Sequence, residues 1–247
     1  MKLPMIRGII DRRILINFRV DPEIVRPMLP EPLHPRLHDG HAIAGVCLIR
    51  LTKLRPNWLP QWLGMSSEGA AHRISVCWEE AGIHKTGVFV PRRDSSSRIN
   101  GLLGGRLFPG VHHHALFEFV ESENQIEVSV RDREDRSIIR LSARLCDEFP
   151  ASSIFGSLDA ASRFLEDDKV GISPRRLGRG LEALELRIRQ WKIRPVNVSA
   201  LSSSFFDDPT RFPSGSATLD CAVHMSDIEH EWRVAPTPVN GANLPTG

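Results

Sequence analysis

The chain has 247 residues, of which 41% are hydrophobic and 25% are charged, and its formal net charge at pH 7 is +2. This composition is typical of a globular protein with its own core, and the small net charge gives no support for a nucleic-acid or membrane partner. No apolar run reaches the length of a membrane span and Arg7, Asp11, Arg12 and Arg13 interrupt any signal sequence, so we expect a cytoplasmic protein.

The first third of the chain predicts strands separated by short turns. Residues 12–20 (RRILINFRV) predict a β-strand, and Asp21 followed by Pro22 predicts a short helix that ends at the prolines of residues 27–30. Residues 41–54 are long, apolar and rich in β-branched side chains, so they predict a buried strand. Residues 56–64 (PNWLPQWLG) predict a loop or short helix.

The next segments predict a hairpin followed by a glycine-rich connection. Residues 70–80 and 85–93 are strand-like and flank AGIH, which has the character of a turn. Residues 94–110 begin with capping residues and end with glycines, which predicts one or two helical turns that lead into a histidine-rich strand.

The second half predicts more strands and one clear helix. An antiparallel meander is predicted from three strand-like runs, residues 111–120, 124–132 and 136–146. Residues 156–168 predict a helix, because Ser157 can cap it and its apolar residues share one face. Strand character returns in two further runs, residues 181–198 and 217–234.

This pattern predicts a mainly β fold of the α+β type over residues 1–235, as one domain, with a flexible tail over 236–247. Eight or more strands with two or three helices favour a strongly curved antiparallel sheet that closes into a barrel. A barrel of this size can enclose a ligand cavity.

Three consecutive histidines follow the glycine-rich segment, in GGRLFPGVHHHAL. Because side chains alternate along a strand, His112 and His114 share a face whereas His113 points away. Three interpretations stay open. The pair lies on a solvated strand end with His113 in the core, or it lies in a polar cavity as hydrogen-bond donors or proton carriers, or it binds a metal with a third ligand such as His72.

Other polar residues provide candidate partners for a ligand. The segment FVPRRDSSSRIN brings Arg93 and Arg98 into one strand-to-helix junction, where ion pairs with Asp94 or a bidentate grip on a carboxylate are both possible. Four scattered cysteines have the apolar contexts of buried thiols rather than the spacing of a zinc or redox motif. The sequence has no G-x-G-x-x-G motif, P-loop or G-x-S-x-G motif, and we expect no cofactor. We also expect no metal, because alternation along the strand separates His113 from His112 and His114.

Long segments of the chain resemble one family. The segments FRVDPEIVRPMLPEPLHPRLHDGHAIAGVCLIRL, GVFVPRRDSSSRINGLLGGRLFPGVHHHALFEF and IFGSLDAASRFLEDDKVGISP are similar to YqjF-like proteins of the acetoacetate decarboxylase-like superfamily. The segments LELRIRQWKIRPVNV and FPSGSATLDCAVHMSDIEHEW resemble the end of these proteins, so the resemblance covers roughly residues 10–233. It implies a cone-like barrel around a cavity with peripheral helices.

The sequence departs from the pattern of the superfamily at one position that carries the chemistry of the decarboxylase. The decarboxylase of this superfamily forms an imine with its substrate through a lysine that follows a Gly-Phe-Pro-like turn. A neighbouring cation and desolvation lower the pKa of that lysine. Here the similar stretch GRLFPGVHHH has histidines and no lysine, and Lys53 and Lys85 are not convincing substitutes. Imine catalysis is therefore not expected, and fold analogy alone does not assign a reaction.

Three hypotheses follow. The preferred one is a cavity that binds a small, anionic organic molecule through His112 and His114, with Arg106 and Arg93 or Arg98 on its carboxylate. The second is a lyase or isomerase-like enzyme in which His112 or His114 is the general acid–base, with Glu79 or Glu80 as its partner. The third is a homo-oligomeric module without catalysis, in which Trp58 and Trp62 form the contact.

Overall fold

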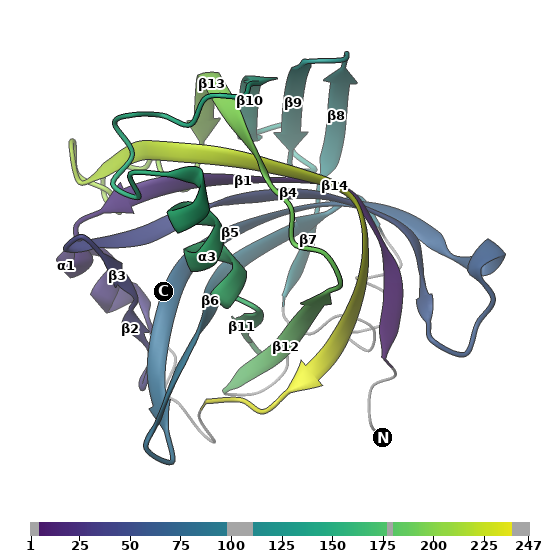
Figure 1. The fold of residues 1–247 in the computed structure, drawn as a ribbon, viewed down its shortest axis with the longest axis horizontal. Helices are drawn as coiled ribbons and strands as arrows, with labels where there is room; N and C mark the ends of the chain where they lie inside the picture. Colours follow the sequence, from purple (N-terminus) through teal and green to yellow (C-terminus); the bar gives the residue numbers. More distant parts are fainter. Residues whose placement is uncertain (1–4, 98–110, 177–179, 239–247) are drawn as a thin grey trace.

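The structure is a computed structural model that describes residues 5–97, 111–176 and 180–238. The described residues form a sheet of 14 strands, and seven of these strands close into a ring (Figure 1). The ring has the order β1-β4-β5-β6-β11-β12-β14, and it closes because β1 also pairs with β14. Its strands are β1 (Ile6–Val20), β4 (His41–Pro56), β5 (Met65–Glu80), β6 (Ile83–Ser95), β11 (Val170–Pro174), β12 (Leu181–Ile188) and β14 (Ala217–Ala235).

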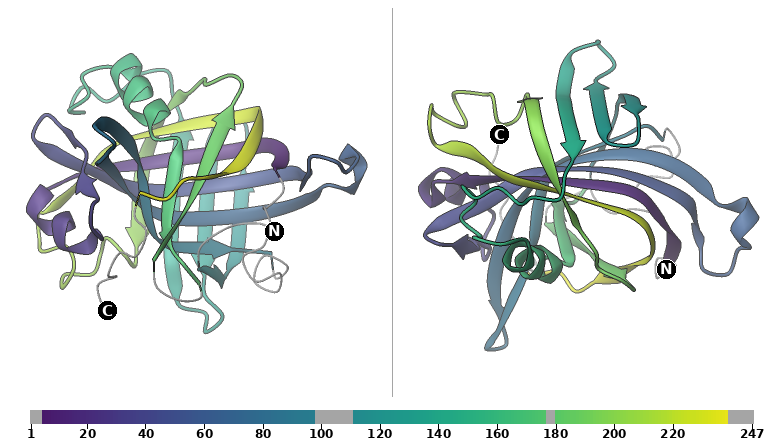
Figure 2. Two further views of the ribbon diagram at one scale, coloured as in Figure 1. Left: turned by 90° about the horizontal axis from the view of Figure 1, so that it is seen from below. Right: turned by 45° about the horizontal axis from the view of Figure 1, so that its top comes forward.

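A second group of strands lies over the side of β1, β4 and β5 that faces away from the ring interior (Figures 1 and 2). It consists of β8 (Leu116–Glu121), β9 (Gln125–Arg131), β10 (Ser137–Leu145) and β13 (Arg194–Ser203). The remaining elements are the strands β2 (His34–Pro35), β3 (Leu37–His38) and β7 (His112–His114) and the helices α1 (Pro22–Val25), η1 (Arg26–Met28), η2 (Gln61–Leu63) and α3 (Leu158–Asp167). The predicted mainly β fold with a strongly curved sheet is confirmed.

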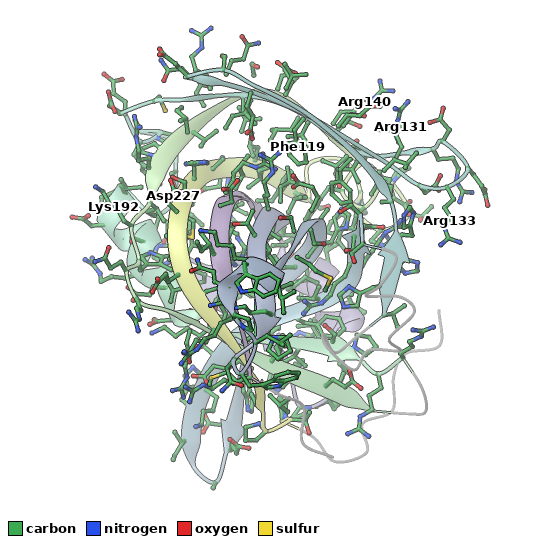
Figure 3. The ribbon with its side chains drawn as sticks, turned by 90° about the vertical axis from the view of Figure 1, so that its right-hand side faces the viewer. Phe119, Arg131, Arg133, Arg140, Lys192 and Asp227 are labelled. Carbon is green, nitrogen blue, oxygen red and sulfur yellow. The ribbon has the colours of Figure 1, made fainter. Side chains whose placement is uncertain are left out.

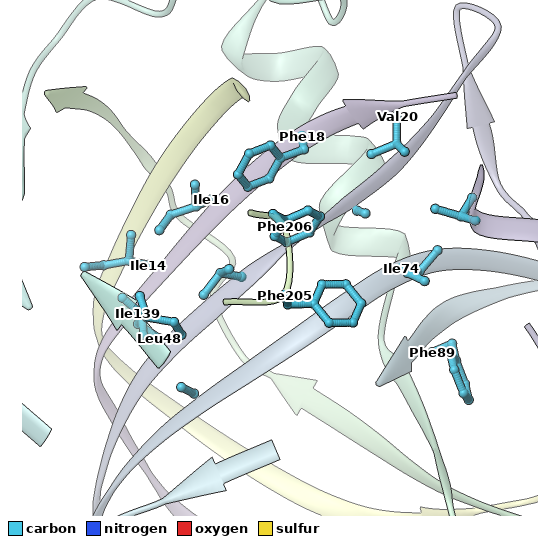
Figure 4. Close-up of a cluster of buried hydrophobic side chains, with 14 of the residues drawn as sticks. Ile14, Ile16, Phe18, Val20, Leu48, Ile74, Phe89, Ile139, Phe205 and Phe206 are labelled. Atoms are coloured by element: carbon cyan, nitrogen blue, oxygen red, sulfur yellow. The ribbon is translucent and has the colours of Figure 1, made fainter. Parts of the chain in front are cut away.

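The strands β1, β4 and β5 are buried on both faces because each face packs against a different layer. One face contributes to a core with β9, β10 and three phenylalanines, Phe205, Phe206 and Phe212. Figure 4 shows Phe205 and Phe206 with core side chains of β1 such as Ile16 and Phe18. The other face contributes to a second core with α3, β12 and β14. These strands therefore have near-continuous apolar runs such as ILI and AIAGVCLI, rather than the alternation of a half-exposed strand.

Two local predictions are confirmed in detail. The Ser157 hydroxyl accepts a hydrogen bond from the Ala160 amide at 3.2 Å and begins α3, whose buried residues Ala161, Phe164 and Leu165 share one face. The predicted hairpin is β5–β6, and its turn consists of Ala81 and Gly82, both with positive φ. Two positive φ angles in succession match the right-handed twist of the two strands.

Three predictions about strands need correction. Residues 111–120 do not form one strand: the chain breaks at the buried Ala115, β7 pairs with β6, and β8 pairs with β9. The sheet is not purely antiparallel, since β6 pairs in parallel with β7 and β11. Residues 181–198 form two strands, because β12 ends at Ile188 and β13 begins at Arg194. Tertiary pairing, rather than local propensity, decides these strand boundaries and directions.

The connection between β4 and β5 projects from the body of the molecule (Figures 1 and 2). Trp58 and Trp62 lie there with 72% and 80% of their surfaces exposed, near the short helix η2. Residues 98–110 and the end of the predicted tail, residues 239–247, lie outside the described residues, so the helical turns expected before the histidines do as well. Within the ranges that the structure describes, no helix is long and apolar enough to cross a membrane.

Candidate functional site

A cavity of about 130 Å³ lies inside the ring. Every ring strand contributes at least one residue to its wall, from Arg13 on β1 to Trp232 on β14. The segment that follows α3 completes the wall with Asp168 and the exposed Lys169. The wall therefore exists only when the ring is closed.

Small residues leave the space that forms the cavity. Gly69 and Ala71 on β5 and Gly171 on β11 face it, where larger side chains would fill the ring interior. The absence of a side chain at Gly171 also gives room to Arg93, whose Nη2 atom lies 3.2 Å from the position that a Cβ atom would take. The cavity is thus built by residue size as well as by sheet curvature.

The strand register places three arginines at different points of this wall. Arg13 lies opposite Ile49, which lies opposite Gly69. We call each row of paired residues across the strands a rung. On the next rung of the same face, Arg93 lies opposite Ala71 on one side and His112 on the other.

Arg73 occupies the rung beyond, opposite Gly45, and Gly45 in turn lies opposite Asn17. The Arg73 side chain is almost fully buried, and its Nη2 group donates a hydrogen bond across Gly45 to Asn17 Oδ1. Its Nε group has no hydrogen-bond partner among the described residues. Burial lowers the pKa of Arg73, because the charged form loses its hydration.

The other two arginines also donate to neutral groups. Arg93 Nε donates to Ser173 Oγ at 3.2 Å, and Arg13 Nε donates to Cys47 Sγ at 3.4 Å. Burial lowers the pKa of Arg93 to about 10, so this side chain stays cationic at neutral pH. None of the three arginines forms an ion pair within 4.0 Å with a carboxylate of the described residues.

The acidic residues of the wall are held by other arginines. Glu68 pairs with Arg12 and Arg50, and Asp94 pairs with Arg92. Asp168 pairs with Arg36 at 3.0 Å. The four arginines that neutralise these acids are not part of the wall. The cationic excess of the wall is therefore not cancelled by its own carboxylates.

The excess remains when all ion-pair partners are included. We counted the charged wall residues, their ion-pair partners, and the ion-pair partners of those residues. The set contains eight cationic side chains and six carboxylates. The cations are Arg12, Arg13, Arg36, Arg50, Arg73, Arg92, Arg93 and Lys169, and the carboxylates are those of Asp11, Glu68, Asp94, Glu121, Asp167 and Asp168. Within this set of described ion-pair partners, the positive charges therefore exceed the negative ones by two.

Asp168 is a buried carboxylate of the wall with a shifted pKa. Its side chain is 3% exposed, and it accepts hydrogen bonds from Ser75 Oγ at 2.6 Å and from Arg36 at 3.0 Å. Burial raises its pKa to about 6, and the hydrogen bonds and the neighbouring Arg36 and Arg73 offset only part of this effect. Asp168 can therefore change its charge near neutral pH.

The residues predicted from sequence do not all lie at this cavity. Arg93 and His112 line it as register partners, and His114 lies opposite Ser95 one rung away. His112 and His114 are half-buried and His113 is exposed, which matches the predicted alternation but places His113 outside the core. Arg98 and Arg106 lie outside the described residues.

Two other candidate residues lie elsewhere. Glu79 is near the β5–β6 turn, is 66% exposed and pairs with His84 at 3.1 Å, whereas the cavity lies at residues 67–73 of the same strand. Glu80 is next to it and 43% exposed. His72 points away from the cavity: its Nε2 atom lies 3.0 Å from Ser203 Oγ, and burial lowers its pKa to about 3. Among the described residues, no group of three or more histidine, cysteine or acidic side chains could hold a metal ion.

Sequence reasoning missed Arg13, Arg73, Asp168 and Lys169. The available signal was a charged residue inside an apolar strand, as in AAHRISV, since an arginine is rarely buried without a partner. Asp168 and Lys169 follow a helix, and only the tertiary fold brings the end of that helix to the ring.

Comparisons with known proteins agree with this fold. The structure is similar to acetoacetate decarboxylase from Legionella pneumophila subsp. pneumophila str. Philadelphia 1, with a TM-score of 0.61 and 13% identity over 96% of this chain and 89% of that one. An acetoacetate decarboxylase-like enzyme from Sphingomonas wittichii RW1 gives 0.61 and 13% over 98% and 95%. The enduracididine biosynthesis enzyme MppR, complexed with pyruvate, gives 0.59 and 12% over 99% and 91%.

These identities are low, so the similarity shows the fold alone. No curated protein matches the sequence. Residues 10–226 match the family DUF2071, whose description is "Uncharacterized conserved protein (COG2071)". Because this match spans most of the chain and the fold is that of acetoacetate decarboxylase-like proteins, the chain belongs to the DUF2071 family.

Proposed function

We propose that the protein binds a small organic anion with a carboxylate group in the cavity inside the ring. One observation carries the proposal: Arg13, Arg73 and Arg93 line the cavity without an ion pair to any described carboxylate. A buried guanidinium without an anion is costly, and its planar set of N–H donors fits a carboxylate in a bidentate geometry. An anionic ligand would supply the missing partner.

The size of the cavity limits the ligand. A cavity of about 150 Å³ in another protein binds benzene, so a cavity of about 130 Å³ suits a molecule of about that size. Apolar side chains such as Ile49, Val88 and Val90 make up much of the remaining wall. A short carbon chain with an acidic end matches both features.

The test uses pyruvate and its neutral isostere pyruvamide in isothermal titration calorimetry. Pyruvate is chosen because the structurally similar MppR was solved as a pyruvate complex. We expect saturable binding of pyruvate and at least about tenfold weaker binding of pyruvamide, since a charge-assisted hydrogen bond contributes about 1.5–3 kcal/mol.

The Arg73→Met and Arg93→Met variants should each weaken pyruvate binding by about tenfold or more. The control is Arg140→Met, because Arg140 is exposed on the outer sheet, away from the cavity (Figure 3). Equal binding of the two isosteres, unchanged affinity in both variants, or no binding of pyruvate, acetate, malonate or succinate at millimolar concentration would each contradict the proposal.

Binding of pyruvate should weaken as the pH rises from 5 to 7.5. Below its folded pKa of about 6, Asp168 is protonated and its negative charge is absent from the wall, so the anion is attracted more strongly. Above that pKa the carboxylate repels the anion. A shift of the Asp168 pKa by about one unit on binding corresponds to about a tenfold change in affinity.

The measurement is calorimetry across this pH range for the wild type and for Asp168→Asn, which should have a flatter profile. Charged or titratable groups near Asp168 include Arg36, Arg73, Cys77 and Lys169, and His112 also lines the cavity. The His112→Gln variant is therefore measured in parallel. A profile that flattens in His112→Gln but not in Asp168→Asn would assign the dependence to the imidazole.

A second candidate function is proton transfer to or from the bound ligand, in a lyase or isomerase-like enzyme. It is favoured by the position of His112, which lies beside Arg93 in the cavity wall. The test is exchange of the pyruvate methyl protons with deuterium in D₂O, followed by NMR. Exchange that is accelerated by the wild type and by His114→Gln but not by His112→Gln would support His112 as the base; no acceleration would remove this candidate.

A further inference from the structure

We infer that the cavity takes a dicarboxylate of about three or four carbons in preference to a monocarboxylate of the same length. This inference rests on the proposed function and specifies the class of ligand. It follows from the number and the spacing of the unpaired cations in the wall.

The wall contains three arginines that its own carboxylates do not neutralise. The three acids of the wall, Glu68, Asp94 and Asp168, already have arginine partners that lie outside the wall. Glu182 on β12 also acts on Arg93 through its charge, yet no described carboxylate forms an ion pair within 4.0 Å with Arg13, Arg73 or Arg93. A ligand with two carboxylates would supply direct partners to two of these guanidinium groups.

The spacing of the cations points the same way. Arg13 comes from β1 and Arg93 comes from β6, with β4 and β5 between them. Three strand spacings correspond to roughly 14 Å of sheet, so these long side chains enter the cavity from two sides. Arg73 lies on β5 between them, two rungs farther along than the rung of Arg13. One carboxylate can neutralise one side and would leave a half-buried cation without an ion pair on the other.

The surface between the cations is apolar and shallow. Gly69 shares a rung with Arg13, and Ala71 and Cys47 share the next one with Arg93, all three on the strands β4 and β5 between the two arginines. A short methylene chain can lie over these small residues while its two ends reach the two guanidinium groups.

The experiment compares succinate with butyrate, which have the same number of carbons and differ in the second carboxylate. Isothermal titration calorimetry at constant ionic strength should show that succinate binds at least about tenfold more tightly. Malonate against propionate repeats the comparison with one carbon fewer. Constant ionic strength is needed because a dianion is screened more strongly by salt.

Variants then assign the preference to the two sides. In Arg13→Met and in Arg93→Met, the preference for succinate over butyrate should fall to about threefold or less, whereas Arg140→Met should keep it. Arg13→Lys keeps the positive charge but loses the bidentate set of N–H donors, and it replaces Arg13→Met if that variant folds poorly. It should keep part of the preference for succinate. Circular dichroism of each variant confirms the fold.

The outcomes separate the inference from the proposed function. If succinate and butyrate bind equally, the dicarboxylate inference is wrong and the proposed carboxylate site stands. If the preference survives in both arginine variants, the inference is also wrong, since the second carboxylate is then bound elsewhere. If neither ligand pair nor pyruvate binds, both are wrong.

Discussion

Replacing Ile16 with alanine is expected to lower the free energy of unfolding by about 2–5 kcal/mol. Ile16 is fully buried on β1, in the core between the ring and the outer strands, near Phe18 and Ile14 (Figure 4). Truncation removes three buried carbons and leaves a cavity, because the surrounding long strands are fixed by pairing on both edges and cannot close in. Urea unfolding followed by circular dichroism measures the loss.

The matched control is Ile83→Ala. Ile83 begins β6 beside the hairpin turn and is 57% exposed, so its truncation should change the free energy of unfolding by about 0.5 kcal/mol or less. A loss below about 1 kcal/mol in Ile16→Ala would show that this core repacks around the missing atoms, contrary to the picture of a rigid layer.

Replacing Asp220 with alanine should cost about 2–4 kcal/mol of stability. The Asp220 side chain on β14 is fully buried and accepts hydrogen bonds from Ser153 Oγ at 2.6 Å and from the Ile154 amide at 2.9 Å. Alanine leaves both donors without an acceptor in a buried place. The segment they hold contains Phe155, which packs against Phe164 of α3.

Two companion variants sharpen this prediction. Asp220→Asn keeps the shape and one acceptor oxygen, so it should lose less than Asp220→Ala. Asp147→Ala removes a carboxylate that is 95% exposed and pairs with Arg194 on the surface, and it should have an effect within about 0.5 kcal/mol. Equal stability of Asp220→Ala and Asp147→Ala in urea unfolding would refute the structural role given to Asp220.

The sequence predicts elements well where the deciding interactions are local. The helix α3 is fixed by the Ser157 cap and by the spacing of its apolar residues, and the β5–β6 hairpin is fixed by its two-residue turn. Both signals lie within a few residues of the structure that they determine. The same is true of the alternation that separates His113 from its two neighbours.

The sequence fails where a strand changes partner. The run VHHHALFEFV is strand-like throughout, yet it divides at Ala115 because its first part joins β6 and its second part joins β9. Nothing in the local sequence marks this division, since both parts have the same propensity. Partner choice depends on where β6 and β9 lie in the folded molecule.

The candidate site illustrates the same limit. Arg93 and His112 were proposed for one ligand from the sequence, and they are register partners in the cavity wall. Arg13 and Arg73 were not proposed: Arg13 lies in the charged run DRR before the apolar part of its strand, and Arg73 follows His72 in AAHRISV. Their meeting with Arg93 is produced by the pairing of β1, β4, β5 and β6, which a single sequence does not encode locally.

The closure of the ring has a consequence for synthesis of the chain. Ile6 on β1 lies opposite Trp232 on β14. One edge of β1 therefore stays unpaired until β14, the last strand of the ring, has been synthesised. A nascent chain therefore carries an apolar β1 with one free edge until almost all of the domain has left the ribosome, which favours slow folding and a need for protection against aggregation. A small anion that binds only the closed ring would then stabilise the complete fold, and it would not stabilise a chain that lacks β14.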